Sequence, residues 1–142
     1  MNKIMLAPAL ALVVWTLCMW VLLYATRLPA IFKAKVDFNK VRTANQLRAA
    51  LPEKTSWISD NYNHLHEQPV IFYTLCFILA LVTEHNELNA VLAWVYVALR
   101  VTHSLWQSFV NIIPVRFAIF VLASSVLFAL AFRAALVFYI NL

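Results

Sequence analysis

The chain has 142 residues, of which 64% are hydrophobic and 12% are charged, and its mean hydropathy is +0.80. Soluble domains are roughly half apolar, so this composition excludes an ordinary soluble protein and predicts an integral membrane protein. A transmembrane helix needs about 20 apolar residues, so the length allows three or four spans and leaves no room for a separate soluble domain.

Four apolar segments predict an all-α fold, a membrane bundle of four helices in a single domain covering residues 1–142. The first segment lacks a small-residue cleavage site and is longer than the apolar region of a signal peptide, so we interpret it as a retained span. In the second, only Val70 to Val82 is free of polar residues, which is too short to cross alone, so the polar run NYNHLHEQP before it must supply length. The predicted spans cover about residues 5–25, 60–83, 88–110 and 115–140.

The connection between the first two spans is long and basic. The next connection, TEHNELN, has no Lys or Arg, so the positive-inside rule predicts that the long loop is cytoplasmic and that both termini and the turn from Glu84 to Glu87 lie outside. Most of the net charge of +5 comes from the long loop, and contact with anionic lipid headgroups explains it better than nucleic acid does. Its basic residues are Arg27, Lys33, Lys35, Lys40, Arg42, Arg48 and Lys54.

A polar stripe runs along the third span. Tyr96, Arg100, His103 and Gln107 are spaced by four, three and four residues, which places them on one face of a helix. Ionisable residues inside a membrane helix face protein or water and mark a functional site by default. The alternative is that Arg100 only pairs with an acid on a neighbouring helix, and Glu67 in the second span is the obvious acid.

The arginines of the third and fourth spans predict a cavity. Arg100 precedes Arg116 by sixteen residues, or roughly 24 Å along an ideal helix, and His103 and Gln107 fall between them. A cavity that opens on the cytoplasmic side would present Arg100 at its deep end and Arg116 at its mouth. Such a cavity suits a small, polar, anionic ligand.

The remaining polar residues in apolar surroundings favour structural roles. His64 and His66 point about 200° apart on a helix, so they cannot bind one ion, and no metal site is predicted. We interpret both, together with His85, as interfacial residues. Arg133 lies near the C-terminus, and we expect it either to extend to the outer interface or to contact a second subunit.

Two sequence motifs resemble those of a known family. The run NHLHEQP in the second span, followed by VYVALRVTHSLWQ in the third and by Arg116 after a short loop, resembles the MAPEG family, the membrane-associated proteins of eicosanoid and glutathione metabolism. The similarity covers essentially the whole chain. It implies a homotrimer of four-helix subunits, with glutathione bound between neighbouring subunits near the cytoplasmic side.

The resemblance also implies roles for individual residues. Arg116 matches the arginine that stabilises the glutathione thiolate, and we assign it the catalytic role. Glu67 matches a glutamate that contacts the tripeptide, and Arg27 matches a further arginine for a carboxylate. The expected glutathione-binding residues are Arg27, Asn63, Glu67, Arg100, His103 and Gln107.

The chain departs from the family pattern at several of these positions. Asp60 and Asn63 stand where characterised enzymes carry basic residues, and Gln107 stands where a tyrosine is expected. Phe117 and Phe120 replace polar residues after Arg116. Fewer cations are therefore available for the two carboxylates of glutathione.

Two functions are favoured on this pattern, and the chain is left uncertain as an enzyme. The first is a glutathione-dependent transferase or peroxidase that acts on hydrophobic electrophiles. The second is a non-catalytic membrane protein on the same scaffold that binds a lipid or presents it to a partner. A channel or transporter is a third hypothesis, disfavoured because the chain has one short polar stripe instead of a continuous pore lining. The expected location is the inner membrane of a bacterium, with membrane lipids around the protein and no nucleic-acid partner.

Overall fold

The computed structural model describes residues 3–82 and 87–140, which form helices and no strand. Four stretches of the described chain are long and apolar enough to cross a membrane. The all-α membrane bundle predicted from the sequence is therefore confirmed. The helices are α1 (Lys3–Lys33), α2 (Ala44–Ala50), α3 (Glu53–His64), α4 (Gln68–Val82), α5 (Glu87–Phe109) and α6 (Ile113–Ile140). The predicted outer turn and His85 fall largely on residues 83–86, outside the described residues.

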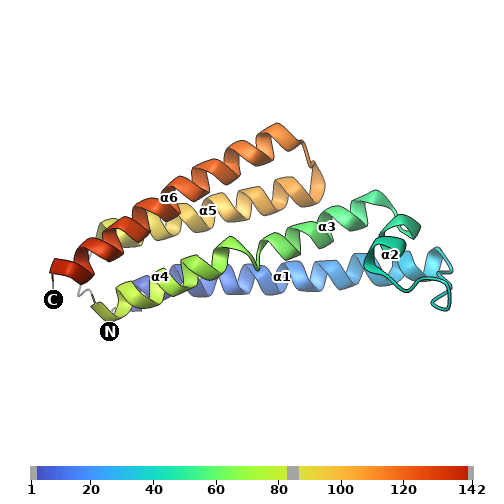
Figure 1. The fold of residues 1–142 in the computed structure, drawn as a ribbon, viewed down its shortest axis with the longest axis horizontal. Helices are drawn as coiled ribbons and strands as arrows, with labels where there is room; N and C mark the ends of the chain where they lie inside the picture. Colours follow the sequence, from blue (N-terminus) through green and yellow to red (C-terminus); the bar gives the residue numbers. More distant parts are fainter. Residues whose placement is uncertain (1–2, 83–86, 141–142) are drawn as a thin grey trace.

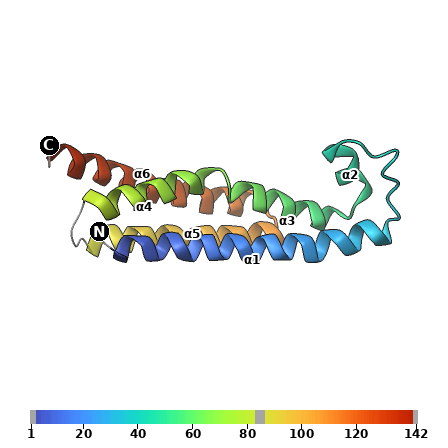
Figure 2. The ribbon, with the colours of Figure 1, turned by 90° about the horizontal axis from the view of Figure 1, so that it is seen from below.

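The long helices pack side by side in an elongated bundle (Figure 1). Helix α1 packs against α3, α4 and α5, and α5 also packs against α6. Helix α1 begins and α6 ends at one end of the bundle, whereas α2 lies at the opposite end (Figure 2). The start of α1 and the end of α6 lie on the same side because each connection between spans reverses the chain, and four spans return it to the end where it began.

The second span is made of two helices rather than one. Helix α3 ends at His64 and α4 begins at Gln68, and together they cover the span from Glu53 to Val82. In the turn between them, the Leu65 amide donates to the Asn61 carbonyl at 3.1 Å. Pro69 lacks an amide hydrogen and fits the first turn of a helix, which explains why α4 starts here. The polar run thus adds length as predicted, but with a break in its middle.

The chain reverses between α5 and α6 at a residue with a left-handed backbone conformation. Asn111 has a φ of 54°, a conformation that asparagine tolerates at the end of a helix. Its amide donates to the Trp106 carbonyl at 2.7 Å, and its side-chain Oδ1 accepts from Arg116 Nη1 at 2.8 Å. The turn that reverses the chain therefore also orients Arg116.

Helix α5 carries most of the buried polar side chains. The predicted stripe is confirmed, because Tyr96, Arg100, His103 and Gln107 are all buried. Near the start of α5, Arg133 Nε donates to the buried Asn89 Oδ1 of the same chain. The sequence did not predict this contact because Asn89 and Arg133 are far apart along the chain.

One buried hydrogen bond connects α3 to α5. Asn61 Nδ2 on α3 donates to Ser104 Oγ on α5 at 2.7 Å, and both residues are fully buried. Neither group can find water in this position, so the bond must be kept for both to remain satisfied.

We predict that Ser104→Ala lowers the free energy of unfolding by about 1 kcal/mol, because the Asn61 amide loses its acceptor inside the bundle. Thermal unfolding in detergent measures the change. Ser125→Ala is the matched control, since Ser125 is exposed and bonds only to a carbonyl of its own helix. Equal effects of the two substitutions would contradict this account.

Candidate functional site

Three cavities lie around the end of the bundle that carries α2. The α1 cavity, of about 260 Å³, includes Arg27, Ser59 and Asn63 in its wall. The α6 cavity, of about 650 Å³, includes Trp57, Asn111 and Arg116. The aromatic cavity, of about 210 Å³, is lined by His64, His103, Ile113, Arg116, Phe117 and Phe120.

Arg116 is shared by two cavities of different character. It lies in the first turn of α6 and lines both the α6 cavity and the aromatic cavity. Its Nη1 is held by Asn111, as described above. Phe117 next to it is 66% exposed, so the aromatic cavity adjoins a surface that faces lipid if the span lies in a membrane.

His103 closes the inner side of the aromatic cavity. Its ring lies 6.2 Å from that of Phe120 and 6.3 Å from that of His64, measured between centroids. It is almost completely buried. His103 and Arg116 therefore both line this cavity, whereas Arg100, predicted at its deep end, is not part of its wall.

Arg100 lies deeper, at 1% exposure, and contacts none of the three cavities. Its Nε donates to the Tyr96 hydroxyl at 3.0 Å, and its guanidinium carbon lies 5.3 Å from the Tyr96 ring and 5.2 Å from the Phe120 ring. Two aromatic faces thus stabilise this buried cation. Arg100 Nη2 has no partner among the described residues.

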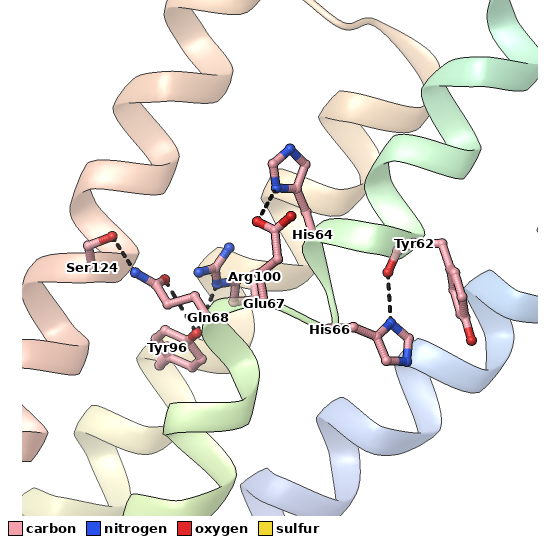
Figure 3. A network of polar contacts seen from close by, with 8 residues as sticks. All are labelled: Tyr62, His64, His66, Glu67, Gln68, Tyr96, Arg100 and Ser124. Atoms are coloured by element: carbon pink, nitrogen blue, oxygen red, sulfur yellow. Dashed lines mark hydrogen bonds and ion pairs between the residues drawn. The ribbon is translucent and has the colours of Figure 1, made fainter. Parts of the chain in front are cut away.

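The hydroxyl that holds Arg100 belongs to a network across three helices (Figure 3). Tyr96 Oη donates to Gln68 Oε1 at 3.5 Å, and Gln68 Nε2 donates to Ser124 Oγ at 2.8 Å. Gln68 is the first residue of α4, and Ser124 lies in α6. The network therefore fixes the start of α4 against α5 and α6.

The predicted pairing of Arg100 with Glu67 is wrong. Glu67 is exposed, and its Oε2 contacts His64 Nδ1 at 2.9 Å (Figure 3). The break between α3 and α4 changes the direction of Glu67, so the spacing of an uninterrupted helix does not apply across it. No carboxylate within the described chain pairs with Arg100.

The other expected binding residues are also separated. Asn63 and Arg27 line the α1 cavity, where Arg27 Nη1 donates to Ser59 Oγ at 3.3 Å. Gln107 is fully buried, and neither of its amide atoms has a partner in the described part of the chain. Within one chain the seven predicted residues thus do not form a single site. They are divided between the α1 cavity, the aromatic cavity, the exposed Glu67 and the buried Arg100 and Gln107.

The model of the MAPEG family matches residues 5–136. The chain belongs to the MAPEG family. Searches of curated proteins and of solved structures each found no significant match. Family membership, together with the four apolar helices, establishes a membrane protein of the family concerned with eicosanoid and glutathione metabolism.

Sequence reasoning missed two features of this MAPEG chain. The first is the bond from Gln68 to Ser124, which connects α4 to α6. Gln68 lies within the motif NHLHEQP and Ser124 lies in an apolar helix, so the only signal in the sequence was an amide at the edge of a span. Arg48 was counted only as a charge of the basic loop. In the structure it forms an ion pair with Asp60 in the wall of two cavities.

Proposed function

We propose that the chain is a membrane-embedded transferase that uses the thiol of glutathione on hydrophobic electrophiles, with Arg116 as the catalytic residue. The position of Arg116 carries this proposal. Arg116 lines both the α6 cavity, whose wall also includes Arg48 and Asp60, and the aromatic cavity. A water-soluble thiol and a membrane-dissolved electrophile can therefore meet at one cation.

The chemistry follows from the charge of Arg116. A free thiol has a pKa of about 8.5 and is mostly protonated at neutral pH, whereas a nearby guanidinium favours the thiolate. The thiolate sulfur then forms a bond to an electrophilic carbon while the leaving group departs, and the thiol proton passes to water. With a lipid hydroperoxide, two thiols give a disulfide, an alcohol and water, so a peroxidase reaction is open to the same site.

Glutathione binding is proposed to involve Arg27, Asn63, Glu67, His103 and Arg116 from more than one subunit of a homotrimer. Their separation within one chain supports this, because no single described hollow contains them all. The exposed Glu67 is then available to a neighbouring subunit or to the ligand. Arg100 and Gln107 act behind the cavity wall in this proposal.

The long basic loop is proposed to be cytoplasmic, with both termini outside. The structure supports a common side for the termini, since α1 begins and α6 ends at the same end of the bundle (Figure 1).

A second candidate is a non-catalytic lipid-binding protein on the same scaffold. It is favoured by the apolar wall of the aromatic cavity, where Phe117 and Phe120 leave Arg116 as the main charged group. An acyl chain would lie along these rings with its headgroup near Arg116.

We predict that Arg116→Ala lowers the rate of glutathione conjugation to chlorodinitrobenzene roughly 100-fold, the effect of losing one charged group that stabilises a reacting anion. The pH profile should change as well. The rate rises as the thiol loses its proton, and this rise should be centred below about 8.5 in the natural protein and close to 8.5 in the variant.

Arg42→Ala serves as the control for this experiment, because Arg42 is an exposed arginine outside the three cavities. Unchanged turnover and pH profile in Arg116→Ala would refute the catalytic role. A natural protein that neither binds nor uses glutathione, and that is purified with a bound lipid, would favour the second candidate.

We predict that the basic loop lies on the cytoplasmic side of the membrane, and Asn39→Cys places a cysteine in an exposed part of this loop to test it. A membrane-impermeant maleimide should label this cysteine in inside-out vesicles and not in intact cells. The two natural cysteines lie in the membrane-spanning helices α1 and α4 and provide the background. Labelling of Asn39→Cys in intact cells would reverse the proposed orientation.

We predict that native mass spectrometry of the detergent-solubilised protein gives a mass of three chains, because the expected binding residues need neighbouring subunits to meet. If dilution separates the trimer into single chains, glutathione binding should be lost. A stable single chain that binds glutathione fully would contradict the shared site.

A further inference from the structure

The ion pair between Arg48 and Asp60 forms part of two cavities. Both residues line the α1 cavity and the α6 cavity, together with Asn45, Leu51 and Ser56. Arg48 comes from α2 in the basic loop, and Asp60 comes from α3 at the start of the second span. The pair therefore stands between the hollow that contains Arg27 and the hollow that contains Arg116.

Exposure argues against a purely structural role for this pair. The side chain of Arg48 is 52% exposed and that of Asp60 is 34% exposed. Ion pairs this accessible contribute little to stability, since water competes for both charges. Their position at the wall of two cavities, however, makes both charges reachable by a ligand.

We propose that Arg48 binds a carboxylate of the ligand and that Asp60 occupies Arg48 as an internal substitute for that carboxylate when the site is empty. A guanidinium presents the same paired donors to any carboxylate, so a ligand can exchange with Asp60 without a new geometry. This inference rests on the proposed use of an anionic thiol.

The charges of the α1 cavity limit the ligand. Arg27 and Arg48 contribute two positive charges and Asp60 one negative charge, so the described lining carries 2 − 1 = +1. This balance suits one carboxylate of the ligand within this cavity. Arg27 lines only the α1 cavity, whereas Arg48 lines both this cavity and the α6 cavity that contains Arg116. The ligand is thus a thiol that presents one carboxylate to Arg48 while its sulfur reaches Arg116.

The two members of the pair should therefore have opposite effects on binding. Arg48→Ala removes the cation, and we expect the dissociation constant of glutathione to rise about tenfold. Asp60→Asn removes the competing anion while nearly keeping its shape, and we expect the constant to fall about threefold. Arg42→Ala, in the same loop, should leave it unchanged. Isothermal titration calorimetry of the purified trimer with glutathione measures all three.

The ligand side provides a second test. Glutathione diethyl ester lacks both carboxylates, so Arg48→Ala should not change its dissociation constant. Arg48→Lys keeps the charge and should retain part of the affinity for glutathione, and thermal unfolding of each variant reports whether the fold is kept. A structural clamp between α2 and α3 would instead make Arg48→Ala and Asp60→Asn weaken binding together, in step with their unfolding temperatures.

The outcomes separate this inference from the proposed function. Equal effects of Arg48→Ala and Asp60→Asn, in a protein whose turnover still depends on Arg116, would overturn the inference alone. Opposite effects on binding, in a protein without turnover, would support the inference and refute the transferase. Absence of glutathione binding to the natural protein would overturn both.

Discussion

The interruption of the second span at Leu65 to Glu67 determines how the polar residues of this protein are used. A continuous helix would satisfy its own amides in lipid, whereas a break leaves backbone groups that need other partners. Here the turn bonds within itself, and Gln68 connects the new helix to Tyr96 and Ser124. The same turn directs Glu67 outward to His64.

The surroundings of Arg100 follow from that turn, because it directs Glu67 away from the inside of the bundle. Without Glu67 as a counter-ion inside the bundle, its charge is stabilised by a tyrosine hydroxyl and two aromatic faces. Such contacts offset only part of the cost of burying a cation. The network from Ser124 to Arg100 thus both supports the broken helix and holds this arginine in place.

The sequence predicted features that depend on the period of a single helix. The four spans and the buried stripe from Tyr96 to Gln107 both follow from hydrophobicity and a spacing of three or four residues, and both are present. The predicted pairing of Glu67 with Arg100 failed, because a helical period does not continue through the turn between α3 and α4. The spacing rule gave no information on Arg133, whose partner Asn89 lies on another helix.

The basic loop exposed a second limit of sequence reasoning. A run of Lys and Arg in a loop has no period, so each residue counted equally towards topology and lipid contact. Capping of α2 by Thr43 and Gln46 gives this segment a defined helix, and only then does Arg48 acquire a specific partner on α3. Individual roles in such a loop depend on tertiary contacts that charge counting cannot supply.

Phe120 separates the two arginines that the motif places together. Its ring lies close to the Arg100 guanidinium and to His103, and it lines the aromatic cavity together with Arg116. Arg116 is part of the wall of that cavity, whereas Arg100 is not. The positive charge of Arg100 can therefore influence an anion there through its field, and the weaker screening inside the bundle makes that influence stronger than in water. Arg116 lines the cavity itself, so a chain with fewer cations than its family pattern still concentrates positive charge at this point.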